Sequence, residues 1–204
     1  MLRRLALAYD AQLRRRPLAV KCATSACVVG ASDLGVQFAL WAAAAPPAAP
    51  TSDEGVHGIS TLPDAGPAHK SGVDVGRSAF IGAAYGGCVF APVLHTVTTT
   101  WHRVLPSTAL PALVLKTVVD MTTSFPVNMA ANICVQSVAR HGYRGPEPLA
   151  DAVRGNLWPA VTAGWQFWPL ASMAMYGAVP LHYRVLFLNA NSFFWNAFLV
   201  WRFA

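Results

Sequence analysis

The segment from Gly164 to Ala204 constrains the fold most, because it is almost continuously apolar and rich in tryptophan. Trp158 lies directly upstream, and the only charged residues in the segment are two arginines. In water such a run would be prone to aggregation. In a bilayer, Trp and Tyr settle at the headgroup level while Leu, Phe and Val face lipid. Pro169 and Pro180 interrupt the run, and membrane helices tolerate proline where neighbouring groups satisfy the freed carbonyls. We therefore expect this segment to lie in a membrane.

The composition of the 204 residues agrees, since 54% are hydrophobic and only 12% are charged. An average soluble domain carries about 25% charged residues. The net charge of +6 is spread along the chain, without the basic, aromatic-interleaved face that binds nucleic acid. No hydrolase, zinc-protease, phosphate-loop or dinucleotide motif occurs, and the four cysteines form no C-x-x-C pair. We expect no catalytic, metal or cofactor site, no nucleic-acid partner, and membrane lipids around the chain.

Apolar runs of about 20 residues can span a bilayer. They predict an all-α integral membrane protein, a bundle of about four transmembrane helices with a C-terminal helical limb broken off by Pro180. The predicted spans are residues 17–45, about 74–105, 110–139 and 160–179, and the limb is 181–201. The limb is either a fifth span or a bent continuation. Within these runs, Gly82-x-x-x-Gly86 is a spacing that lets helices approach closely, and Pro126 is expected to kink the third span.

The connecting segments are polar. Residues 46–72, rich in Pro, Ala, Gly and Ser, are expected to form a disordered linker, and residues 140–158 an exposed loop with a short interfacial helix. Residues 17–45 and 73–204 then form one membrane domain. Residues 1–16 contain five arginines between leucines and alanines, a basic amphipathic segment typical of mitochondrial targeting. It is equally compatible with a basic tail that sets orientation and places the N-terminus on the matrix side of an inner membrane.

Polar residues inside the predicted spans are costly, about 2.5–3.5 kcal/mol each for Asp or Lys on insertion scales. They are therefore expected to face the bundle interior as an intramembrane polar cluster. A bridge from Asp33 to Lys116 is hypothesised at its centre, because Lys116 and Asp120 alone have the less favourable order for an intrahelical pair. The cluster is either a polar path or a buried network that fixes helix register. Its members are Asp33, Gln37, His95, Lys116 and Asp120.

The order of residues from Gly164 to Asn196 resembles the signature of the Mpv-seventeen family, which includes the twenty-two-kilodalton peroxisomal membrane protein. That signature reads N-W-x-x-W-P-x-x-Q-x-x-N-F-x-x-V-P, followed by an arginine and then W-N. The spacing matches without a gap from Gly164 to Pro180. The matching positions are Trp165, Trp168, Pro169, Val179, Pro180, Arg184, Trp195 and Asn196. The departures are Gly164 and Met175 for asparagine, Ser172 for glutamine, Tyr176 for phenylalanine and, in the third span, Met121 for glutamine.

The resemblance implies a non-enzymatic, multi-pass protein of an organellar membrane, associated with channel-like activity and organelle homeostasis. Two functions are open: a small-solute pore, and a structural accessory subunit of a larger membrane complex or a homo-oligomer. The loss of family polar residues favours the second. The mitochondrial inner membrane is the expected location, with the peroxisomal membrane as the alternative.

Overall fold

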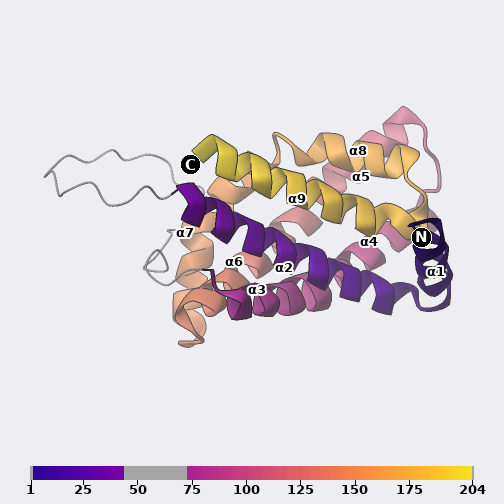
Figure 1. The fold of residues 1–204 in the computed structure, drawn as a ribbon. Helices are drawn as coiled ribbons and strands as arrows, with labels where there is room; N and C mark the ends of the chain where they lie inside the picture. Colours follow the sequence, from indigo (N-terminus) through magenta and orange to yellow (C-terminus); the bar gives the residue numbers. More distant parts are fainter. Residues whose placement is uncertain (1, 44–72, 204) are drawn as a thin grey trace, which may run out of the picture.

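In a computed structural model of the chain, which describes residues 2–43 and 73–203, every element of those ranges is helical (Figure 1). The predicted linker 46–72 lies outside the described residues. The elements are α1 (Leu2–Arg15), α2 (Pro17–Ala43), α3 (Val75–Ile81), the π-helix η2 (Gly82–Phe90), α4 (Ala91–Val104), α5 (Leu110–Thr122), α6 (Ser124–His141), α7 (Pro146–Gly164), α8 (Trp168–Ala178), the 3₁₀ turn η3 (Leu181–Tyr183) and α9 (Arg184–Phe203).

The outside of the bundle is apolar, and its interior holds about as many polar as apolar side chains. Large apolar side chains are exposed on several helices, among them Phe38, Trp41, Val114, Leu170 and Phe194. Within residues 2–43 and 73–203, two helical stretches, Pro17–Ala42 and Val75–Val104, are long and apolar enough to cross a membrane. This distribution is the one expected of a chain whose solvent on the outside is lipid, because polar groups there must find partners inside.

The second predicted span is one continuous helix made of α3, η2 and α4, with a π-helical stretch in its middle. Pro92 explains why the helix widens before it: proline lacks the N–H that would bond residue 88, and its ring would clash with that carbonyl. The widened stretch packs against α2, and the predicted glycine spacing lies at the contact. A Cβ placed on Gly82 would come within 2.4 Å of the Ala26 carbonyl oxygen.

The third predicted span is broken in two, as expected from Pro126. Helix α5 ends at Thr122 and α6 begins at Ser124, so the break at Thr123 precedes the proline by one turn. Proline cannot donate to the carbonyl of residue 122, which frees that turn of the helix. At the break the Thr122 and Thr123 hydroxyls also donate to the carbonyl of Val119, at 3.2 and 2.6 Å.

The predictions for residues 140–158 and 160–179 are wrong at their boundary. The polar stretch is not a loop as far as residue 158, because α7 runs as one helix from Pro146 to Gly164 with Pro159 inside it. Because Pro159 has no N–H, the carbonyl of residue 155 receives no backbone hydrogen bond from it. The predicted fourth span is instead divided by a turn at residues 165–167, and α8 starts at Trp168–Pro169, where proline suits a first helical turn.

The short amphipathic helix α1 lies across the end of the bundle at which α2 and α9 begin (Figure 1). It is held there by the Tyr183 hydroxyl, which donates to Asp10 Oδ1 at 2.9 Å, and by a 3.2 Å contact between the Tyr9 and Thr24 hydroxyls. Leu13 is buried beneath it. The apolar core of the bundle gathers around Met175, Tyr176 and Leu188, where α8 and α9 meet α4 and α5.

Candidate functional site

Asp120 of α5 is buried and joins three helices through its carboxylate. The Trp101 indole of α4 donates to Oδ1 at 2.7 Å, and the Tyr176 hydroxyl of α8 donates to Oδ2. A buried carboxylate that accepts two hydrogen bonds is a satisfied group, and each donor is a neutral side chain. Asp120 therefore fixes the register of α4, α5 and α8 without an ion pair.

Two buried cations contact the ring of Tyr176. Lys116 Nζ lies 5.6 Å and Arg184 Cζ 5.3 Å from the ring centroid, within the range of a cation–π interaction. Lys116 also donates to the Ser107 carbonyl at 2.8 Å, and Arg184 Nε donates to the Val179 carbonyl at 3.1 Å. Tyr176 thus stands between a carboxylate at its hydroxyl and two cations at its ring.

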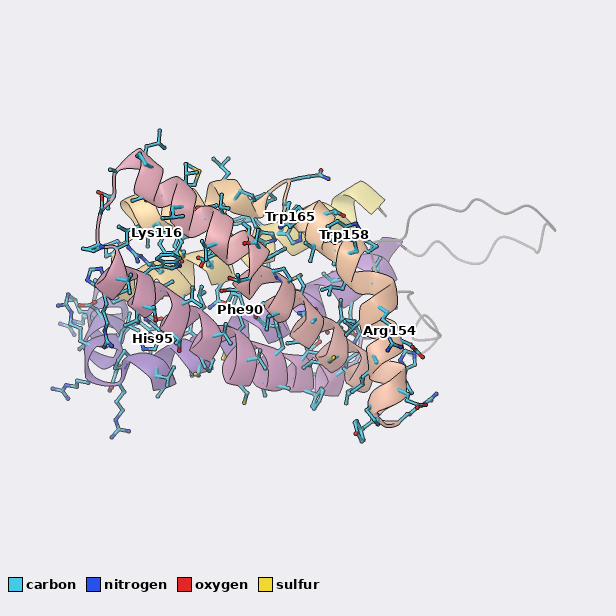
Figure 2. All side chains as sticks on the ribbon, turned by 180° about the vertical axis from the view of Figure 1, so that it is seen from behind. Phe90, His95, Lys116, Arg154, Trp158 and Trp165 are labelled. Carbon is cyan, nitrogen blue, oxygen red and sulfur yellow. The ribbon has the colours of Figure 1, made fainter. Side chains whose placement is uncertain are left out.

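A third buried cation, Lys21 of α2, lies in the same part of the bundle. Its Nζ is 3.1 Å from Nδ1 of His95 on α4, so the imidazole accepts from the lysine in the tautomer protonated at Nε2. Arg184 is within electrostatic range of both Lys21 and Lys116. Figure 2 shows His95 and Lys116 toward the same end of the bundle, with Arg154 at the other.

Asp33 and Gln37 form a separate group at the start of α3. Ser78 Oγ and Gln37 Nε2 donate to Asp33 Oδ2 at 2.7 and 2.8 Å, and Arg77 forms an ion pair with Oδ1 at 3.1 Å. The hypothesised bridge from Asp33 to Lys116 is therefore wrong. Asp33 lies twelve residues beyond Lys21 in α2, about 18 Å along the axis at 1.5 Å per residue, and faces a different neighbour.

The structure thus sorts the predicted polar cluster into three groups. Asp33 and Gln37 share the contact with α3, Lys116 and Asp120 meet through Tyr176, and His95 pairs with Lys21. The sequence analysis did not single out Lys21, Arg77 or Trp101 as residues of the bundle interior. Lys21 carried a signal, since it lies inside an apolar run.

The signature residues build the corner between α7, α8 and α9. The Trp165 indole donates to the Met121 carbonyl at 3.0 Å, which ties the turn after α7 to α5. The Trp168 and Trp195 rings lie 6.4 Å apart. The Val179 carbonyl accepts from Arg184, Pro169 lies in the first turn of α8, and Pro180 caps the start of η3. The backbone of Asn196 is in α9, and its side chain lies outside the described part of the structure.

A cavity of about 100 Å³ lies beside Asp120, between α4, α5, α6, α8 and α9. Roughly 10–15 Å³ on this measure holds one water, so the cavity can take several. Its wall is mainly aromatic and aliphatic, with a few polar groups. The buried Asn128 Oδ1 has no hydrogen-bond partner among the described residues, which points to water or a ligand donor there. The polar lining residues are Tyr85, Asp120, Ser124, Asn128, Ser172 and Ser192.

Comparison with known proteins bears on the same corner. The model of the Mpv17 / PMP22 family matches residues 144–200. Protein sym-1 of Neurospora crassa is 25% identical over 194 residues, which cover 95% of both chains. The chain is thus similar to the Mpv17 / PMP22 family over its C-terminal part and to a SYM1 protein along nearly its whole length. Protein SYM1 of Saccharomyces cerevisiae is 22% identical over 95% of this chain and 87% of its own, and that of Gibberella zeae is 30% identical over 58% and 66%. No solved structure matches significantly.

The departures from the Mpv17 / PMP22 pattern gather at the cavity. Met121, Ser172 and Met175 line it. Gly164 does not line the cavity itself but leaves space for the ring of Phe125, which does. A Cβ at position 164 would lie 2.3 Å from Cζ of Phe125. Asparagine cannot occupy position 164 while the Phe125 ring lies where it does. Relative to the pattern of the Mpv17 / PMP22 family, this cavity wall has a hydroxyl at position 172 and thioethers at positions 121 and 175 in place of amides.

Proposed function

We propose that this organellar membrane protein conducts small solutes through the interior of its helix bundle, without catalysis. The observation that carries the proposal is the partly polar cavity next to Asp120, enclosed by a bundle whose outside is apolar. A cavity with hydroxyl, amide and carboxylate groups inside an apolar shell offers a solute the hydrogen bonds that lipid cannot.

The membrane arrangement that goes with this function has four spans. They are α2, the continuous helix α3–η2–α4, the broken helix α5–α6, and the end of α7 with α8, followed by the limb α9. We infer that the membrane is the mitochondrial inner membrane, because α1 is a basic amphipathic helix. Imaging a C-terminally tagged protein, with the N-terminus free, distinguishes mitochondria from peroxisomes. Proteolysis of the 46–72 linker only from the matrix side would contradict a matrix-facing N-terminus.

Flux measurements test conduction directly. Purified protein in liposomes is expected to release small hydrophilic solutes faster than protein-free liposomes. Ser172→Leu fills the cavity wall and is expected to slow release, since Ser172 is 4% exposed and lines the cavity. Ala174→Leu adds the same side chain to the exposed side of the same helix and is the matched control. Equal release from both variants, each folded by circular dichroism, would refute conduction through this cavity.

A second function, as an accessory subunit of a larger membrane complex, is favoured by one observation. Met121 and Met175 stand in the cavity wall where the family pattern has amides, so the lining is less polar than the pattern predicts. Stoichiometric co-purification of another membrane protein in mild detergent, with no flux from the isolated chain, is the result that supports this role over conduction.

A further inference from the structure

One end of the bundle, called here the basic end, carries an excess of cationic side chains. It is formed by α1, the first turns of α2, the last turn of α4 and the start of α9 (Figure 1). Arg14, Arg15 and Arg16 are exposed there, and α4 ends in His102 and Arg103. Asp10 is the only acidic residue among the first 32 and is bonded to Arg14 at 2.9 Å. A surface of this charge raises the local concentration of anions.

Inside the basic end lie the three cations of the candidate site, and all are almost fully buried. Lys21 is 3% exposed, Lys116 2% and Arg184 8%. They come from α2, α5 and α9, so three helices far apart in the sequence bring positive charge to one region. Burying one unpaired charge is already expensive, and like charges near one another add repulsion.

These cations have no anionic partner in the described part of the chain. Their hydrogen bonds go to neutral acceptors: the imidazole of His95 for Lys21, the Ser107 carbonyl for Lys116, and carbonyls of α8 and the turn after it for Arg184. No described carboxylate lies within the 4.0 Å ion-pair distance of any of the three. Asp120, the acid of this region, bonds to Tyr176 and Trp101 instead.

We propose that Lys21, Lys116 and Arg184 form a binding site for a phosphate group. Two ammonium groups and one guanidinium offer hydrogen-bond donors to an oxyanion, and the planar guanidinium fork matches phosphate geometry. Tyr176 holds Lys116 and Arg184 through its ring, and His95 holds Lys21. The exposed arginines of α1 and Arg103 of α4 lie at the same end of the bundle. The inference names the solute class of the proposed conduit and in that respect rests on it, although binding itself does not require conduction.

The alternative explanation for these buried groups is that the two lysines are neutral, so that no anion is needed to offset their charge. The two explanations differ in what phosphate does to the protein. A ligand that binds only the folded state raises its stability in proportion to ligand concentration over Kd. Neutral lysines in an already satisfied site gain nothing from phosphate. Unfolding of the full chain in uncharged detergent, with sodium chloride holding ionic strength constant, is therefore measured as inorganic phosphate is titrated.

Phosphate is expected to raise the Tm of the wild-type protein. Lys21→Met and Arg184→Gln are expected to weaken the apparent affinity for phosphate about 10- to 100-fold, the factor typical of one hydrogen bond to a charged group. The phosphate-free Tm of Lys21→Met is expected to equal or exceed that of wild type, because an uncompensated buried charge is gone. Arg77→Gln is the matched control: Arg77 is also largely buried but already pairs with Asp33, so this variant keeps the wild-type phosphate response. No phosphate effect in wild type, or an equal loss in Arg77→Gln, would overturn the proposal.

The phosphate group could belong to a free solute or to a lipid headgroup, and a second arm separates them. The same titration is made in phosphatidylcholine vesicles with and without phosphatidylglycerol. A phosphate effect that persists in both identifies a soluble ligand, and one that the anionic lipid replaces identifies a lipid phosphate at the same cations. Flux is measured on the same samples. Phosphate binding without flux removes the proposed conduit and leaves the site, whereas flux indifferent to phosphate and to Lys21→Met removes the site and leaves the conduit.

Discussion

The contact between α2 and η2 depends on the absence of side chains at two glycines, and Gly82→Ala tests that dependence. A Cβ at Gly82 would meet the Ala26 carbonyl oxygen at 2.4 Å and the Gly30 Cα at 3.1 Å. Since ordinary contact begins at 3.4 Å, the two backbones must separate by 3.4 − 2.4 = 1.0 Å at this point. Gly86 repeats the situation one turn later, at 2.6 Å from the Ser25 carbonyl oxygen.

The expected magnitude combines two opposing effects. Overpacking of a well-packed contact costs about 1–3 kcal/mol. Replacing a helical glycine by alanine returns roughly 0.5–1 kcal/mol through helix propensity. A net loss of about 1–2 kcal/mol of unfolding free energy is therefore expected for Gly82→Ala. Gly35→Ala is the matched control, because a Cβ there meets nothing within 4 Å, and this variant is expected to be neutral or slightly stabilised.

Reversible unfolding in mixed detergent micelles, followed by tryptophan fluorescence and circular dichroism, measures the two variants against wild type. The informative quantity is the difference in unfolding free energy between Gly82→Ala and Gly35→Ala, because both substitutions gain the same amount from helix propensity. If Gly82→Ala is as stable as Gly35→Ala, the two helices do not touch through their backbones at this position and the reasoning is refuted.

Three further predictions concern side chains. Tyr183 and, second to it, Arg14 hold the pKa of Asp10 below its usual range. The Tyr183–Asp10 contact is therefore expected to anchor α1 above pH ~4, the pKa of Asp in the unfolded chain. It is expected to be lost as pH falls through the lower pKa of Asp10 in the folded protein. Proteolysis within α1 across that range checks it, and Asp10→Asn should abolish the pH dependence. Tyr176→Phe removes one of two donors from buried Asp120 and should cost about 1–3 kcal/mol; an Asp120→Asn background in which the loss stays the same would contradict the contact. Asp33→Asn and Lys116→Met are expected to be additive in thermal unfolding, because they lie in separate groups, and a coupling above about 0.5 kcal/mol would argue for direct contact.

Sequence alone predicted the features that depend on local chemistry. The helices 17–43 and 75–104 follow from unbroken apolar length, and the break before Pro126 follows from its missing N–H. The extent of α7 did not, because Pro159 reads as a helix boundary in the sequence although the helix continues through it to Gly164.

The pairing of buried charges was beyond sequence for a different reason. Spacing within a helix correctly put Asp33 and Gln37 on one face, where they bond at 2.8 Å. Spacing says nothing about the height at which a neighbouring helix lies, so Lys116 was assigned a partner from the other end of α2. Lys21 is the α2 residue that lies in the same part of the bundle as Lys116. Its own partner, His95, comes from the middle of another span.

The fit of Phe125 against Gly164 has a consequence for how such a chain can change over generations. A Cβ at position 164 would lie 2.3 Å from the ring, so a larger residue at 164 requires the Phe125 ring to move. A smaller residue at 125 would leave space for that change without any movement. The two positions are therefore coupled, and a substitution at one changes which substitutions the other can accept.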